Sequence, residues 1–85
     1  MAARQYDIDP HFTRRLEQRR IPFRSVWYAI KNAVSCDPYV PERPPLRGGN
    51  SWRVAGPDHE GTMTSVGVET YVDHLGRRML LVTVF

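Results

Sequence analysis

The sequence predicts a small α+β domain in which two N-terminal helices pack on a three- or four-stranded antiparallel sheet. Three observations favour this fold class: apolar residues at helical spacing before residue 35, strand-like alternation after residue 50, and a length of 85 residues, which suits one domain. We therefore expect residues 1–85 to form a single domain. A chain this short buries roughly 60–65% of the surface that its unfolded form exposes, so its core is thin.

The first helix is predicted from Pro10 to about Arg20. The side chain of Asp9 can cap the free backbone N–H groups, and proline at the first helical position loses no hydrogen bond. Phe12 and Leu16 stand four residues apart, so they share one face of the helix and are expected in the core.

A second helix is predicted from Phe23 to about Ala33, because apolar residues recur there at helical spacing. These residues are Phe23, Val26, Trp27, Ile30 and Val34. Between Asp37 and Asn50 the chain holds four of its seven prolines and a pair of glycines, which neither a helix nor a central strand tolerates. We expect a long loop there, preceded by a short edge strand within Ser35 to Val40.

Three strand-like segments follow, at Ser51 to Gly56, Thr62 to Val72 and Arg77 to Phe85, with turn sequences between them. The last segment is apolar on both faces, which predicts an interior position in the sheet. The expected order of elements is therefore α-α-(β)-β-β-β, with both helices on one face of a meander.

Cysteine content and hydropathy indicate the compartment. The single cysteine, Cys36, cannot form an internal disulfide, whereas a small secreted domain usually depends on several. The longest apolar run, Met79 to Val82, is far too short to span a membrane, and no apolar segment follows the N-terminal charges. We therefore expect a cytoplasmic protein with no membrane partner. The histidines and the cysteine stand too far apart for a zinc motif, so we expect no metal and no cofactor.

Positive charge concentrates in the first part of the chain. Residues 1–31 hold seven basic and three acidic residues, a net charge of +4, whereas the rest holds five basic and six acidic residues, a net charge of −1. Eleven of the twelve cations are arginine, whose planar guanidinium can bind phosphate or carboxylate through two hydrogen bonds at once. This distribution fits a phosphate ligand, and an ordinary solvated helix face is the alternative.

The sharpest motif is His11-x-x-x-Arg15-x-x-x-Arg19. On a helical wheel, at about 100° per residue, these three side chains lie at about 0°, 40° and 80°. Phe12 and Leu16 lie at about 100° and 140° on the same wheel, so the basic stripe borders the buried stripe. We therefore expect the three side chains of the motif to converge at the rim of the helix–sheet packing, where a cleft would open.

Like charges stacked along a helix repel one another by roughly a few tenths of a kcal/mol per pair when exposed. Stability alone would not favour the stripe, whereas an anion in the cleft or a carboxylate such as Glu69 would offset the repulsion. The alternative is that the arginines lie over apolar surface with only their guanidinium groups in water. Elsewhere, Arg53 alternates with apolar neighbours and is expected to point into the cleft. Arg47, beside two glycines, could contact phosphate from the loop.

The segments HFTRRLEQRRI (residues 11–21) and LVTVF (residues 81–85) resemble a family of small bacterial domains of unknown function. That family opens with H-x-x-x-R-x-x-x-R-x-I and closes with an apolar strand that carries a threonine, and the match runs from Asp9 to Phe85. The chain departs from the family pattern at Arg20, where glycine is usual, at Pro22, where a serine cap is usual, and in the proline-rich loop.

The order of elements in that family resembles the RelE-like and barnase/EndoU/colicin superfamily of metal-independent ribonucleases, which includes toxins of toxin–antitoxin systems and secreted bacterial toxins. The resemblance implies an endoribonuclease toxin with RNA as substrate and a cognate antitoxin or immunity protein as partner. The catalytic residues that it implies are His11, Arg15, Arg19 and Thr83. In this hypothesis the histidine transfers a proton, the arginines clamp phosphate, the threonine donates a hydrogen bond, and Arg53 and Arg47 add substrate contacts. The alternative is a non-catalytic module that binds a protein or nucleic acid through the same arginine face.

Overall fold

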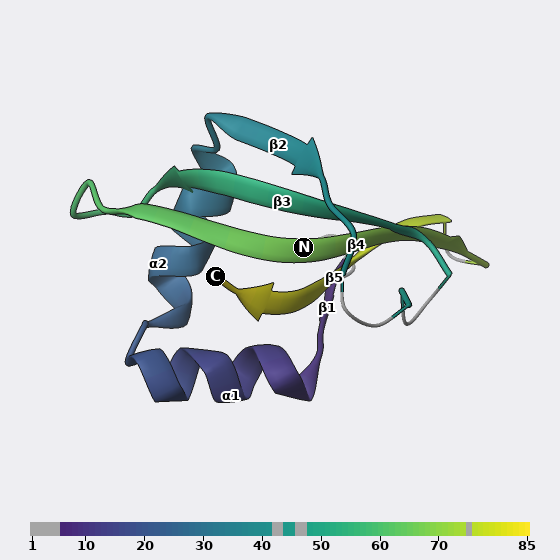
Figure 1. Ribbon diagram of the computed structural model, residues 1–85, viewed down its shortest axis with the longest axis horizontal. Coiled ribbons are helices and arrows are strands. Elements are labelled where there is room, and N and C mark those ends of the chain that lie inside the picture. The colour runs from purple at the N-terminus through teal and green to yellow at the C-terminus, as the bar shows by residue number, and fades with distance from the viewer. Residues whose placement is uncertain (1–5, 42–43, 46–47, 75) are drawn as a thin grey trace.

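The computed structural model describes residues 6–41, 44–45, 48–74 and 76–85. These residues form an α+β fold with two helices against one five-stranded sheet, which confirms the predicted fold class (Figure 1). In chain order the elements are β1 (Tyr6–Ile8), α1 (Pro10–Arg19), α2 (Phe23–Lys31), β2 (Ser35–Pro38), β3 (Asn50–Pro57), β4 (Met63–Asp73) and β5 (Gly76–Val84). Among the described residues, no helix is long and apolar enough to cross a membrane.

The strand order in the sheet is β1-β5-β4-β3-β2. Neighbouring strands from β2 to β5 are antiparallel, whereas β1 runs parallel to β5, with Tyr6 opposite Met79. The predicted three or four antiparallel strands correspond to β2–β5, and the structure corrects the prediction by adding a fifth strand, β1, which pairs parallel to β5. Three residues are too few to show alternation, and β1 is held by a strand from the other end of the chain. β5 pairs on both sides, which confirms its predicted interior position.

The boundaries of α1 follow from its terminal residues. Oδ1 of Asp9 accepts a hydrogen bond from the backbone N–H of His11 at 2.7 Å, and Pro10 occupies the first turn, as predicted. The backbone N–H of Asp9 donates to the carbonyl of Leu81 at 2.9 Å, which ties the start of the helix to β5. The helix ends at Arg20, whose φ of 55° lies in the left-handed region that favours glycine.

Both helices pack into one core. α1 lies along the end of β5, and α2 crosses behind β3 and β4 (Figure 1). The buried core cluster is formed by Phe12, Leu16, Val26, Val66, Val68, Leu81 and Val84. Phe12 and Leu16 are thus buried, as their spacing predicts. α2 begins at Pro22 without a side-chain cap, so its position depends on this packing.

The pairing register divides the sheet into two faces. The helix face packs on the helices and carries Trp52, Val54, Val66, Val68 and Leu81. The outer face lies on the other side of the sheet and carries Ser51, Arg53, Gly67, Glu69 and Thr83. The side chains of Arg53, Glu69 and Thr83 are therefore directed away from the helices.

A β-bulge in β5 sets which residues reach each face. Gly67 pairs with Thr83, whereas the next residue of β4 pairs with Leu81, so Val82 is an extra residue in β5. Because of this bulge, Leu81 and Val84 are both buried in the core although they stand three residues apart. The bulge thereby directs Thr83 to the outer face without disturbing the core.

Candidate functional site

A cleft with a volume of about 620 Å³ opens on the outer face of the sheet. Its walls are the N-terminal half of α1 and the segment that follows β2, and its floor comes from β3, β4 and β5. The polar and aromatic residues of its lining are Asp9, His11, Arg14, Arg15, Tyr39, Ser51, Glu69, Thr83 and Phe85. The cleft therefore joins residues from both ends of the chain.

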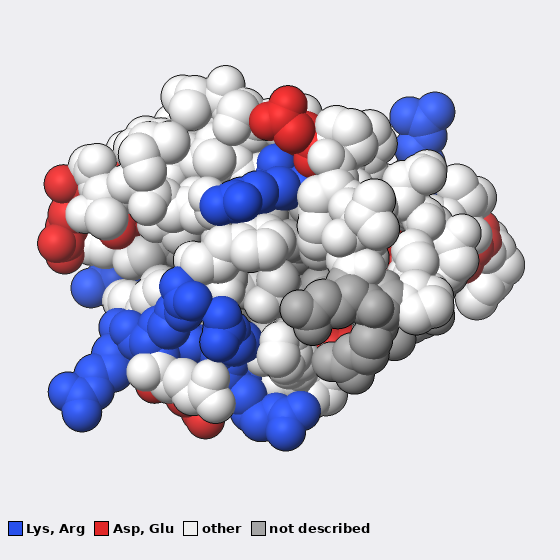
Figure 2. Space-filling view, in the orientation of Figure 1, with Lys and Arg blue, Asp and Glu red and all other residues white. Residues whose placement is uncertain are grey.

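The wall formed by α1 is cationic. Figure 2 shows Lys and Arg side chains gathered over this helix. His11, Arg14 and Arg15 line the cleft, and Nε of Arg15 is buried with no hydrogen-bond partner among the described residues. A buried N–H group without an acceptor costs free energy. An anionic ligand in the cleft would reduce the repulsion between the cations.

The structure separates Arg19 from the rest of the predicted motif. Arg19 is exposed in the last turn of α1 and does not line the cleft. It lies about 12 Å from His11 along the helix axis, and each four-residue step also turns the side chain by about 40°. The predicted convergence therefore holds for His11 and Arg15 and is wrong for Arg19, and Arg14 takes its place in the cleft.

The floor of the cleft carries one buried carboxylate and one hydroxyl. Glu69 is 1% exposed, and its Oε2 accepts a hydrogen bond from the backbone N–H of Gly49 at 3.3 Å. This bond ties the segment between β2 and β3 to the sheet. The hydroxyl of Thr83, opposite Gly67, donates to the carbonyl of Val84 at 3.5 Å. That distance is long for an O–H donor, so the hydroxyl can turn toward a ligand.

Tyr39 forms the wall opposite α1. Its backbone N–H donates to the carbonyl of Ser51 at 3.2 Å, and its ring meets Phe85 edge to face, with centroids 5.5 Å apart. Burial, and secondly the negative charge of Glu69, raise the pKa of the Tyr39 phenol above its ordinary value. The phenol therefore keeps its proton at neutral pH and can donate a hydrogen bond.

The two predicted substrate contacts have different outcomes. Arg53 lies on the outer face, with its guanidinium carbon 4.5 Å from the ring centroid of Phe85. It contacts a residue of the lining and is not itself part of the lining. Arg47 lies outside the described residues, so its predicted contact stays a prediction.

Several residues of the lining were not identified from the sequence as site residues, among them Arg14, Tyr39 and Phe85. The helical wheel could have indicated Arg14 as a neighbour of His11, because it lies about 60° from His11 on the side away from Phe12. Tyr39 lies in the proline-rich segment, and Phe85 follows the last strand. A helical or strand periodicity therefore does not predict which residues these two side chains contact. Only the folded sheet brings these two rings together.

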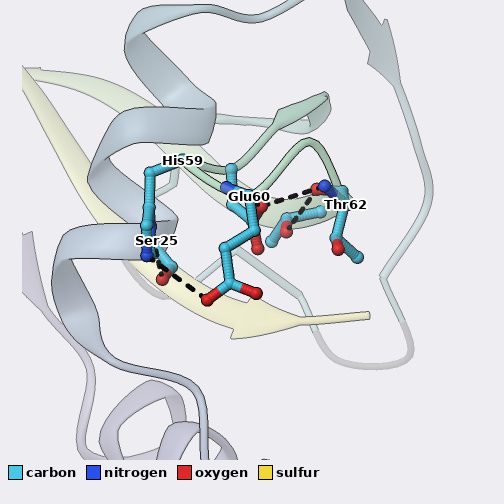
Figure 3. Close-up of polar contacts among 6 residues, drawn as sticks. Ser25, His59, Glu60 and Thr62 are labelled. Carbon is cyan, nitrogen blue, oxygen red and sulfur yellow. Dashed lines mark hydrogen bonds and ion pairs between the residues drawn. The ribbon is translucent and has the colours of Figure 1, made fainter.

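A second polar cluster joins the turn between β3 and β4 to α2 (Figure 3). Oγ of Ser25 lies 3.3 Å from Nδ1 of His59, and Nε2 of His59 lies 3.5 Å from a carboxylate oxygen of Glu60. Oδ1 of Asp58 fixes the turn by accepting from the backbone N–H groups of Glu60 and Thr62. Ser25 is buried and none of these residues lines the cleft, so we assign the cluster to attachment of the turn.

Within the part of the chain that the structure describes, no three His, Cys, Asp or Glu side chains form a group that could hold a metal ion. Comparisons with known proteins found no matching family model, no similar curated protein and no similar solved structure. A functional assignment therefore depends on the geometry of the cleft and on the sequence motif.

Proposed function

We propose that this protein is an endoribonuclease whose active site is the cleft between α1 and the outer face. The observation that supports this most strongly is that His11, Arg15 and Thr83, which the sequence nominates from separate segments, line one cleft. The buried Nε of Arg15 lacks an acceptor among the described residues. A phosphodiester in the cleft would neutralise the cationic wall.

RNA carries its own nucleophile. A base removes the proton of the 2′-hydroxyl, the 2′-oxygen bonds to phosphorus, the P–O5′ bond breaks, and an acid protonates the departing 5′-oxygen. The products are a 2′,3′-cyclic phosphate and a 5′-hydroxyl end. His11 performs one of the two proton transfers, and Asp9 and Glu69 are the lining carboxylates available for the other. Arg15 stabilises the charge that develops on the phosphoryl oxygens, and Thr83 donates to one of them.

Cleavage of cellular RNA stops growth, so a cell that makes such an enzyme needs an inhibitor. We therefore place the protein among the toxins of toxin–antitoxin or contact-dependent systems, acting in the cytoplasm of the producing or target bacterium. Residues 11–21 and 81–85 resemble a domain family of unknown function whose order of elements is similar to that of ribonuclease toxins, and this resemblance supports the role. The partner would be an antitoxin or immunity protein that covers the cleft.

The test is cleavage of tRNA and total RNA by purified protein in EDTA, between about pH 5 and 8. We expect products that end in a 2′,3′-cyclic phosphate and a rate that falls ~10²–10⁴-fold in His11→Ala. Arg24→Ala is the matched control, because Arg24 is exposed on α2 and does not line the cleft. Intact RNA with the wild-type protein, or equal rates for wild type and His11→Ala, would reject the proposal.

The exposed arginines of α1 favour a second candidate, a non-catalytic module that binds nucleic acid. Arg14, Arg19 and Arg20 are all exposed, and exposed arginines bind phosphates without any chemistry. This candidate predicts salt-dependent RNA binding by a protein that leaves the RNA intact. Simultaneous loss of binding in Arg14→Ala and Arg19→Ala would support it.

A further inference from the structure

An aromatic pair lines the same cleft as the cationic residues of α1. Tyr39 and Phe85 both line the cleft, and their rings meet at 85° with centroids 5.5 Å apart. The guanidinium carbon of Arg53 lies 4.5 Å from the Phe85 centroid. Phe85 is still 39% exposed after these contacts. A large aromatic surface is thus presented to solvent next to a charged cleft, where burial in the core would have been the stable alternative.

Gly67 allows this pair to approach the sheet. A Cβ at this position would stand 2.8 Å from the hydroxyl oxygen of Tyr39, 2.8 Å from Cγ2 of Thr83 and 3.3 Å from Cε2 of Phe85. Three side chains from two segments that are distant in sequence therefore meet above one glycine. The pair is held at a fixed place relative to Thr83, which the proposed function puts at the phosphate.

We infer that Phe85, Tyr39 and Arg53 form a subsite for an unpaired nucleobase of the RNA, next to the phosphate that His11 and Arg15 hold. This inference rests on the proposed function and adds the substrate class, single-stranded RNA. Aromatic rings and guanidinium planes bind bases by stacking, and every base offers a π-face. In an A-form duplex the base faces are covered by their neighbours, so a duplex cannot use this subsite.

A second aromatic surface lacks the cations of α1 that the cleft provides for a nucleotide. A groove of about 880 Å³ between the helix face and the sheet edge is lined by Tyr6, Trp27 and Trp52. Of the two arginines in its lining, Arg78 is already paired with Asp7 at 3.3 Å and Arg77 is exposed on β5, and the cations of α1 are absent. A base there would lie away from the cationic wall of α1, whereas a base on Phe85 lies in the cleft that contains Arg15.

The experiment measures binding without cleavage. The probe is a fluorescently labelled 2′-O-methyl RNA of about eight nucleotides, in which the nucleophile is blocked, compared with the same phosphate backbone carrying abasic sites. We expect wild-type protein to bind the base-containing oligomer about 5- to 150-fold more tightly than the abasic one. The same 2′-O-methyl sequence as a duplex should bind no more tightly than the abasic strand.

Phe85→Leu should remove most of that preference while leaving the affinity for the abasic strand unchanged. Tyr39→Leu is the second variant, and circular dichroism confirms folding of both. Tyr28→Leu is the matched control, because Tyr28 is an aromatic residue of α2 that is 44% exposed and outside the cleft.

The outcomes separate the subsite from the proposed function. A folded Phe85→Leu protein that keeps the wild-type preference, or a duplex that binds as tightly as the single strand, would overturn the subsite. Arg15→Ala should weaken binding of the base-containing and the abasic strands alike. Unchanged binding of both strands by Arg15→Ala would instead remove the phosphate site, and with it the proposed function.

Discussion

The helix face and the outer face of the sheet are built from the same strands and differ in what their side chains do. On β4, Val66 and Val68 are buried against the helices, whereas Gly67 and Glu69, which alternate with them, lie on the outer face, and Glu69 lines the cleft. The helix face excludes water and holds the fold together. The outer face carries the buried carboxylate of Glu69, the hydroxyl of Thr83 and Gly67. These groups add little to the packing of the core, and they suit a ligand site.

The bulge at Val82 shows how closely the two faces are coupled. Without the extra residue, Leu81 and Thr83 would lie on one face, and either the core or the cleft would lose its side chain. With it, the core keeps Leu81 and the cleft gains Thr83. The core and the cleft can therefore each keep the side chain that they need, provided that the pairing register of β4 and β5 is kept.

The largest expected effect is on the rate of RNA cleavage, which depends on the cleft at the outer face. Arg15→Ala should lower the rate of RNA cleavage by ~10²–10³-fold, because it removes charge stabilisation at the phosphate. Arg19→Ala is its control, since Arg19 lies outside the cleft, and should leave the rate nearly unchanged. Single-turnover assays with thermal melting of each variant check this. Equal losses in the two variants would show that the cleft does not distinguish them.

The second effect is on the free energy of unfolding, which depends on packing at the helix face. Leu81 is 0% exposed, so Leu81→Ala should lower the free energy of unfolding by ~2–5 kcal/mol. Val82→Ala, on the same strand and only partly buried, should cost less. Urea denaturation of both variants provides the measurement. The comparison between faces would be contradicted by a larger loss in Val82→Ala.

Gly67→Ala tests the contact between the sheet and the aromatic pair. The added methyl group would stand 2.8 Å from Tyr39 and Thr83 side-chain atoms, so these side chains must move. We expect a loss of ~1–3 kcal/mol in the free energy of unfolding, together with weaker binding of single-stranded RNA. Chemical denaturation and fluorescence anisotropy measure the two effects. Binding at the wild-type level would show that the position of Tyr39 is unimportant.

A smaller effect lies at the end of α1, outside both faces. Arg20 has a φ of 55°, so Arg20→Gly should stabilise the protein by ~1 kcal/mol and raise Tm by about 4–8 °C. Arg19→Gly is the control, because Arg19 is the last residue of the helix, where glycine should instead destabilise the protein by up to ~1 kcal/mol. Differential scanning calorimetry measures Tm for both variants. A lower Tm in both would contradict the left-handed conformation of Arg20.

The smallest effect concerns alkaline pH. The folded state raises the pKa of Tyr39 above its ordinary value of 10.0, so folding favours the protonated phenol. This contribution to stability is fully present below about pH 10 and is lost as pH rises through the folded-state pKa. In Tyr39→Phe the free energy of unfolding should therefore fall less steeply above pH 10. Parallel slopes for the two proteins in urea denaturation would contradict the shift.

The sequence by itself determined the local features of this protein. Asp9 and Pro10 start α1, four-residue spacing buries Phe12 and Leu16, and the same spacing sends His11 and Arg15 to one side of the helix. Each feature depends on residues within about one helical turn, or on the alternation of a single strand, so a linear pattern carries it. The α+β class follows from the same patterns.

Only the tertiary structure decided how these features combine. The parallel pairing of β1 with β5, the bulge at Val82 and the contact of Tyr39 with Phe85 all join segments that are distant in sequence. It also decided that the cleft opens at the N-terminal half of α1, so that Arg19 in the last turn stays outside it. The physical reason is that a cleft is a relation between elements, and packing and register fix that relation after the local patterns have formed.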